Sequence, residues 1–145
     1  MRSFSHRFRF KASLNQVTAF HSDTRALKML TPPPMIVSFN NVEPLSEGSL
    51  SDFTIWLGPI PIRWVAKHQD IHEYGFRDIQ VRGPFQVWEH THTFTPLTEN
   101  FTEVLDYIQG EPSRHLFPGI LSRFMWLNIP FLFGYRAWRT KRALE

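Results

Sequence analysis

Hydrophobic and polar residues alternate with a period of two along most of the chain. In residues 3–12, Phe4, His6, Phe8 and Phe10 alternate with serine, arginine and lysine, and this period places every second side chain on one face of a β-strand. Further segments show the same strand signals and are separated by turn sequences: residues 35–42, 51–58, 60–71, 76–81, 84–94 and 100–109. The pattern predicts a meander of antiparallel strands.

Two short helices are expected directly after the first strand. Ser13 and Gln16 have the spacing of a capping box, and an amphipathic helix with Val17 on its apolar side follows them. Asp23 can cap a second helix over residues 24–30, which the sequence TPPP at 31–34 ends.

The period changes to three and four near the C-terminus, which predicts one helix of about 25 residues, about 38 Å long. We expect its apolar line to face the sheet and Pro130 to kink it. The apolar stretch 124–135 is shorter than the roughly 20 residues of a transmembrane helix, so we interpret it as buried. The apolar line consists of Leu116, Ile120, Phe124, Leu127, Phe131, Tyr135 and Trp138.

Length and composition indicate one folded domain over residues 1–145. Hydrophobic residues make up 42% and aromatic residues 15% of the chain, against 20% charged residues, which suits a large core or a lined cavity. The chain has no cysteine, so disulfides, thiolate zinc sites and a cysteine nucleophile are excluded.

Charge and the N-terminus bear on partners and location. There are 16 basic and 13 acidic residues, and the basic ones gather at the two ends rather than in a dense stripe, so we expect no nucleic-acid partner. The first residues follow a strand pattern without the continuous apolar segment of a signal peptide. We therefore expect a cytoplasmic protein.

Residues 88–94 read WEHTHTF, and this segment carries the candidate chemistry. Trp88, His90, His92 and Phe94 share one strand face. If the turn to the next strand is centred near 97–98, His90 lies opposite Asp106, and this pair can form a hydrogen bond. The same register places His92 opposite Val104, Phe94 opposite Thr102 and Trp88 opposite Ile108.

The pair of His90 and Asp106 has two interpretations. In the structural one, the carboxylate satisfies a buried imidazole and fixes its tautomer. In the functional one, the imidazole is a general acid or base that the carboxylate orients. We favour the structural interpretation, because no nucleophile or third polar group accompanies the pair in the motif.

A metal site is not expected. Two histidines in the pattern H-x-H can supply two zinc ligands, but a third or fourth is needed. Nothing in the sequence decides which residue would come near: His68, His72, Glu73 or Asp106. We predict no metal and no cofactor.

The order of elements resembles the START-like superfamily (SRPBCC), and residues 83–136 are similar to the small ligand-binding SRPBCC or polyketide cyclase/dehydrase-like proteins. This resemblance implies an α+β helix-grip fold: a curved antiparallel sheet of about 6–7 strands wrapped around a long C-terminal α-helix, with two short helices after strand 1. It also implies an internal cavity for a hydrophobic ligand, but no single reaction. The matching residues are Gly83, Pro84, Phe85, Trp88, His90, His92, Phe94, Thr102, Asp106, Tyr107, Phe133, Tyr135 and Arg136.

One segment departs from that family. After residues 106–108 these proteins have a Pro-Gly turn, whereas this chain reads QGEPSRHLFPG. We expect the mouth of the pocket near residues 110–119 to differ from the family. Arg136, near the helix end, either faces an acidic ligand group or lies in solvent and favours the helix C-terminus; we favour the second.

The leading functional hypothesis is the binding of a small hydrophobic molecule, such as a lipid, a polyketide or an isoprenoid-like compound. The alternative is a cyclase or dehydratase that uses His90 and Asp106 as acid and base. A second alternative is a membrane-surface or protein-interaction module, in which Trp126, Ile129 and Phe133 would be exposed together; membrane contact is not favoured. The oligomeric state is left open. The candidate ligand-contacting residues are Trp88, His90, His92, Phe94, Asp106, Phe124, Phe131 and Tyr135.

Overall fold

Seven strands form one antiparallel sheet in the order β1-β7-β6-β5-β4-β3-β2. The computed structural model describes all residues from Met1 to Glu145. The strands are β1 (Arg2–Phe10), β2 (Ile36–Val42), β3 (Leu50–Leu57), β4 (Ile60–His72), β5 (Gly75–Arg82), β6 (Phe85–Thr98) and β7 (Phe101–Pro112). The helices are α1 (Leu14–Ser22), the 3₁₀-helix η1 (Thr24–Lys28), α2 (Leu116–Leu127) and α3 (Ile129–Leu144).

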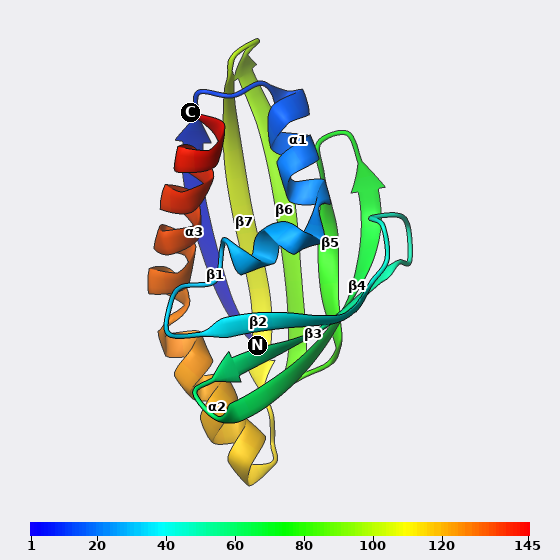
Figure 1. Ribbon diagram of the computed structural model, residues 1–145, viewed down its shortest axis with the longest axis vertical. Coiled ribbons are helices and arrows are strands. Elements are labelled where there is room, and N and C mark those ends of the chain that lie inside the picture. Colours follow the sequence, from blue (N-terminus) through cyan, green and yellow to red (C-terminus); the bar gives the residue numbers. More distant parts are fainter.

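The sheet is strongly curved. Figure 1 shows β2 and β3 running across the direction of β6 and β7, with α1 and η1 lying over the same side of the sheet and the C-terminal helices along it. A curved sheet with a concave face covered by helices is the predicted helix-grip arrangement, and it is confirmed.

The two short helices begin where the sequence predicts. The amide of Gln16 donates to Oγ of Ser13 at 3.2 Å, and the amide of Ser13 donates to Oε1 of Gln16 at 2.8 Å, so both bonds of the capping box are present. Asp23 caps η1 by accepting the amide of Arg25 at 3.0 Å. These bonds satisfy amides that a helix start leaves without partners.

The C-terminal segment is two helices rather than one. α2 and α3 meet at Asn128 with a bend of 53°. Pro130 occupies the first turn of α3, where the missing amide of proline costs no helical hydrogen bond. The prediction of one continuous helix with a kink at Pro130 is therefore wrong, because the chain breaks into two helices just before this proline. Neither helix alone is long and apolar enough to span a membrane, while the bent pair would be by length and composition.

The prediction about which helix face packs on the sheet is wrong. Phe124 and Phe131 are 53% and 66% exposed. The buried positions of the two helices are Gly119, Ser122, Ile129, Phe133 and Thr140. Trp126, Ile129 and Phe133 are thus not exposed together, contrary to what the membrane-surface alternative expected.

Small side chains explain this choice of face. Gly119 and Ser122 let α2 approach the start of the segment that follows β7, where the amide of Ser113 donates to Oγ of Ser122 at 3.2 Å. Trp126 packs over the backbone of Gly110 in β7, where a Cβ atom would lie only 2.7 Å from the indole ring. Close packing thus favoured small residues at these contacts of α2, while Phe124 and Phe131 point outward.

Candidate functional site

A cavity of about 200 Å³ lies between the concave face of the sheet and the helices. Fourteen of its 24 lining residues are hydrophobic. Strands β3 to β6 contribute one wall, α1 and η1 another, and the α2–α3 pair contributes Met125, Leu132 and Arg136. The wall is therefore mainly apolar, with polar groups gathered at one part of it.

The alternation of side chains along the strands brings the polar groups of the cavity to one side of the sheet. Trp88, His90 and His92 occupy every second position of β6, and all three line the cavity. His68 on β4 and Asp78 on β5 point to the same side, and they line it too. Because β4, β5, β6 and β7 are consecutive neighbours in the sheet, residues from distant parts of the sequence come into contact here.

The predicted register of β6 and β7 is wrong by two residues. Asp106 pairs with His92 rather than with His90, and Ile108 is the residue opposite His90. The turn lies at residues 99–100, two positions later than expected, because β6 continues through Pro96 to Thr98.

The predicted hydrogen bond between His90 and Asp106 is nevertheless confirmed. Nε2 of His90 lies 2.8 Å from Oδ1 of Asp106. A slip of two residues keeps each side chain on its face, and diagonal neighbours on antiparallel strands remain within reach of long side chains. The slip therefore changed the pairing without separating the groups.

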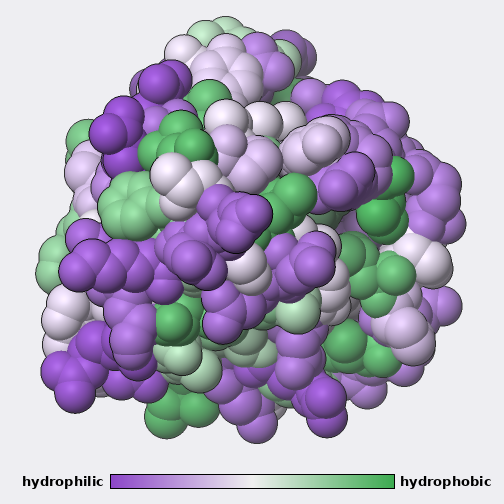
Figure 2. All heavy atoms as spheres, turned by 90° about the horizontal axis from the view of Figure 1, so that it is seen from above, coloured by the Kyte–Doolittle hydropathy of each residue, from purple (hydrophilic) through white to green (hydrophobic).

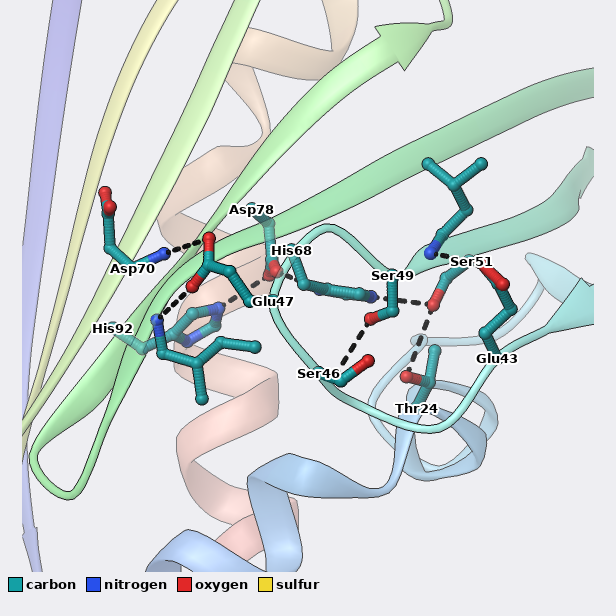
Figure 3. Close-up of polar contacts among 12 residues, drawn as sticks. Thr24, Glu43, Ser46, Glu47, Ser49, Ser51, His68, Asp70, Asp78 and His92 are labelled. Carbon is teal, nitrogen blue, oxygen red and sulfur yellow. Dashed lines mark hydrogen bonds and ion pairs between the residues drawn. The ribbon is translucent and has the colours of Figure 1, made fainter.

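Asp78 joins two histidines from the neighbouring strands. Its Oδ1 lies 2.5 Å from Nδ1 of His68, and its Oδ2 lies 2.8 Å from Nε2 of His92. Nε2 of His68 in turn lies 2.8 Å from Oγ of Ser51. Figure 3 shows this line of contacts, with His68 between Ser51 and Asp78 and with His92 on the other side of Asp78.

Asp106 extends the line on the opposite side of His92. Oδ1 of Asp106 lies 3.2 Å from Nδ1 of His92 and also accepts the bond from His90. The rings of His90 and His92 are 3.8 Å apart between centroids. We call the six connected residues the imidazole–carboxylate network: Ser51, His68, Asp78, His92, Asp106 and His90.

The carboxylates of the network are ionised, and His92 carries the compensating proton. Burial alone would raise the pKa values of Asp78 and Asp106, but hydrogen bonds from the imidazoles outweigh it and hold both well below their usual range. Burial alone would lower the pKa of His92, yet its ion pair with Asp106 and its hydrogen bond to Asp78 raise it to about 9. His92 is thus an imidazolium between two carboxylates at neutral pH.

Two further histidines of the cavity, His90 and His21, are neutral. Burial, together with the charge of His92, lowers the pKa of His90 despite its bond to Asp106. Burial and His92 also lower the pKa of His21 to about 4. Nδ1 of His21 lies 2.8 Å from the carbonyl oxygen of Val17, so the N–H is at Nδ1 and the lone pair at Nε2. An ionised carboxylate can only accept, so Nε2–H of His90 is the donor to Asp106 and the lone pair is at Nδ1.

Arg136 lines the cavity, so the prediction that it lies in solvent is wrong. Its Nε is buried and has no hydrogen-bond partner. The guanidinium lies 5.2 Å from the centre of the Phe133 ring. Burial lowers the pKa of Arg136, while the charges of Asp106 and Asp78 act in the opposite direction.

Three residues of the network could together hold a metal ion. The ligand atoms of Asp78, His90 and His92 lie within 4.8 Å of one another. Asp78 was not among the third ligands that the sequence suggested. Nε2 of His92 bonds Oδ2 of Asp78, and Nε2 of His90 bonds Oδ1 of Asp106, so an ion bound through these nitrogens would have to displace protons.

The predicted site residues divide into three groups. Trp88, His90 and His92 line the cavity; Phe94 and Asp106 are buried beside it and do not line it. No residue from 110–119 lines the cavity either. The third group lies outside it and consists of Phe124, Phe131 and Tyr135.

Sequence reasoning missed several polar residues of the site. Asp78 stands on the same strand face as buried Phe76, and a charged residue at an inward position was the available signal. His21 follows Val17 by one helical turn, which places it on the buried side of α1. Nothing in the sequence indicated that Ser51 belongs to the site.

Comparisons with solved structures show which fold this is. An aromatase/cyclase, Zhui, from Streptomyces sp. R1128 has a TM-score of 0.75 at 10% identity, covering 95% of this chain and 90% of that one. A START superfamily protein from Mycobacterium smegmatis has a TM-score of 0.70 at 13% identity, covering 97% and 98%. A protein from Thermus thermophilus has a TM-score of 0.71 at 20% identity, covering 98% and 99%.

Similarity at the level of sequence is much weaker. No protein-family model matches the chain, and no curated protein matches it. Identities of 10% to 20% to the solved structures support a statement about fold and not about activity. The chain has the helix-grip fold of the START-like (SRPBCC) superfamily.

Proposed function

We propose that the protein binds a small hydrophobic molecule, such as a lipid, a polyketide or an isoprenoid-like compound, in the cavity between the sheet and the helices. The observation that carries this proposal is the cavity itself, whose wall is mainly apolar and contains a few convergent polar groups. Ligand pockets in proteins typically combine these features. The fold shared with START-like proteins supports the same class of function.

The polar groups define which end of such a ligand would be recognised. No protein group bonds to Nε2 of His21, to Nδ1 of His90 or to the guanidinium of Arg136. The two imidazoles are neutral and can each accept a hydrogen bond, whereas the guanidinium donates. A ligand with a hydroxyl, carbonyl or carboxylate at one end of an apolar body would satisfy these groups.

Native mass spectrometry of the protein purified from its own cells tests this proposal. We expect a co-purifying small molecule of fixed mass. The substitution Ala66→Leu adds bulk to the wall of the cavity at a residue that is 7% exposed, and it should reduce or abolish the bound species. Ala143→Leu, at an exposed position of α3, is the matched control and should retain it.

The outcome is decisive only for folded protein, so circular dichroism accompanies each variant. A folded Ala66→Leu variant that retains the full amount of ligand would contradict binding in this cavity. Absence of any bound species in the wild type, before and after incubation with a lipid extract, would contradict the proposal as a whole.

A second candidate function is an acid–base enzyme of the cyclase or dehydratase kind in the same cavity. One specific observation favours it: neutral His90 lines the cavity while the ionised carboxylate of Asp106 orients it from behind. This is the arrangement that a general base requires. Asp106 would then be a positioning residue, because it does not line the cavity.

The same mass spectra separate the two functions. If the protein is an enzyme, wild type should release a mass-shifted product, whereas His90→Asn should accumulate the unchanged substrate. If the protein only binds its ligand, both should hold a species of the same mass.

A further inference from the structure

The outward side of α2 and of the first turn of α3 carries large apolar side chains that no other element covers. Each of six residues is more than half exposed: Leu116, Phe117, Ile120, Phe124, Leu127 and Phe131. Five of them recur at spacings of four, four, three and four, so they follow one side of the helix pair. Trp138 continues this side in α3 and is half exposed. We call these seven residues the apolar stripe.

An apolar stripe of this kind differs from an ordinary protein surface. Figure 2 views the molecule from the end that bears the C-terminus, and there hydrophobic residues appear as separate spots among hydrophilic ones. Single exposed apolar residues need no explanation, whereas a contiguous apolar surface usually marks an interaction site.

The same helix pair carries positive charge only. α2 and α3 contain five basic residues and no acidic residue. The chain has 16 basic and 13 acidic residues, so outside these helices 11 basic residues stand against 13 acidic ones. The net positive charge of the protein therefore resides in α2 and α3. The five basic residues are Arg123, Arg136, Arg139, Lys141 and Arg142, of which Arg136 lines the cavity and does not belong to the outward side.

We propose that the apolar stripe docks on the surface of an anionic lipid bilayer, with α2 and α3 lying in the interfacial plane. Phenylalanine, leucine and isoleucine side chains enter the boundary of the acyl chains, and basic side chains contact the lipid phosphates. Arg142 and Arg139 lie 5.5 and 6.0 Å from the ring centre of Trp138. Tryptophan beside arginine suits the headgroup layer, where apolar and charged groups meet.

The charge distribution argues against a second copy of the chain as the occupant. A symmetric dimer through the stripe would bring two basic helix pairs together, and like charges at an interface repel. An anionic membrane surface is complementary to both properties of the helix pair, apolar side chains and positive charge.

The position of the stripe also relates it to the cavity. Met125, Leu132 and Arg136 of the same helix pair line the cavity, so these helices separate the cavity from the proposed membrane face. The docking proposal does not depend on ligand binding, since it rests on the outward side of the helices alone.

Vesicle co-sedimentation of the full chain tests the proposal. We expect binding to phosphatidylcholine vesicles that contain phosphatidylglycerol, and binding that falls as salt concentration rises. The triple substitution Phe124→Ala, Leu127→Ala and Phe131→Ala should weaken binding by at least about tenfold, because each change removes several buried methylene groups. Ile36→Ala, at a residue of β2 that is 65% exposed, is the matched control and should bind as wild type does.

A double variant and its control test the electrostatic contribution to membrane binding. Lys141→Gln with Arg142→Gln should weaken binding to anionic vesicles by roughly 30-fold, given about 1 kcal/mol for each basic residue near the surface. Arg82→Gln, at an exposed position of β5, should have no such effect. All variants should keep the wild-type circular dichroism spectrum and thermal midpoint, since the substituted side chains are exposed.

The proposal fails if wild type does not bind anionic vesicles, or if the folded triple variant binds them as well as wild type. It also fails if light scattering shows a wild-type dimer that the triple variant dissociates, because the stripe would then be an interface between two copies. Loss of vesicle binding in the triple variant but not in Ile36→Ala supports it.

Discussion

The carboxylate of Asp106 accepts a hydrogen bond from Nε2–H of His90 at 2.8 Å. The same oxygen lies 3.2 Å from Nδ1 of His92. One buried carboxylate therefore orients a neutral imidazole and stabilises a charged one. Removing it should affect the two histidines in different ways, which makes Asp106 the most informative position in the network.

Asp106→Asn should lower both the stability of the protein and the pKa of His92. The variant loses one of the two negative charges that hold His92 protonated. Breaking a buried ion pair by removing one partner costs about 3 kcal/mol, and we expect a loss of this order in the free energy of unfolding from urea titration. An NMR titration should show that the pKa of His92 falls from about 9.

Asp70→Asn is the control for this substitution. Asp70 forms an ion pair with Arg77, and its side chain is 64% exposed, so its loss should cost less than about 1 kcal/mol. Equal effects of the two substitutions on stability would show that the network contributes nothing beyond a surface ion pair.

The stability of the protein should be greatest near pH 6.5 to 7. The pKa of His92 is raised to about 9, so its contribution is complete below pH 6.5 and is lost as the pH rises toward 9. The pKa of His21 is lowered to about 4, so below pH 6.5 the unfolded chain takes up a proton that the folded chain does not. Each of these two histidines changes the free energy of unfolding by about 3 kcal/mol at most.

Denaturant midpoints measured from pH 4 to pH 10 test this profile. In His92→Gln the alkaline decline should become shallower, while the acid decline, to which Asp78, Asp106 and His90 also contribute, should persist. An unchanged alkaline decline in a folded His92→Gln variant would contradict the assignment of that proton to His92.

Gly110→Ala should destabilise the protein through Trp126. A Cβ atom at position 110 would lie 2.7 Å from the indole ring, and overpacking of this kind costs about 1 to 3 kcal/mol. In a Trp126→Ala background the same change should cost much less, because the ring is gone. Thermal unfolding of the four proteins measures the coupling between the two positions.

Gly134→Ala provides the matched control. Nothing lies within 4 Å of a Cβ atom at this position in α3, so alanine should leave stability unchanged or raise it by up to about 1 kcal/mol through its higher helix propensity. Similar losses at positions 110 and 134 would exclude the contact with Trp126 as the cause.

Ser13→Ala should cost about 1 kcal/mol of stability, because Oγ of Ser13 accepts the amide of Gln16 at the start of α1. Gln16→Ala removes the reciprocal bond to the amide of Ser13 and should cost less, since water can replace it at an exposed site. Urea titration distinguishes the two. The substitution Ser5→Ala, at an exposed position of β1, should have no measurable effect.

The sequence alone determined the elements and the strand faces. A period of two identifies a strand whatever its neighbours are, and the capping residues Ser13 and Asp23 act within one helical turn. For the same reason, Trp88, His90 and His92 were assigned to one face before their partners were known. The slip of two residues between β6 and β7 left that assignment intact, because faces repeat with the same period.

Only the tertiary structure decided which helix side faces the sheet and which groups complete the site. Hydrophobic periodicity favoured the line through Phe124 and Phe131, but close packing on Gly110 and the segment after β7 selected the side with Gly119 and Ser122. Asp78 and His68 reach His92 from separate strands because of the strand order, which is a long-range property. Local patterns carry no information on contacts that form only when distant segments of the chain pack together.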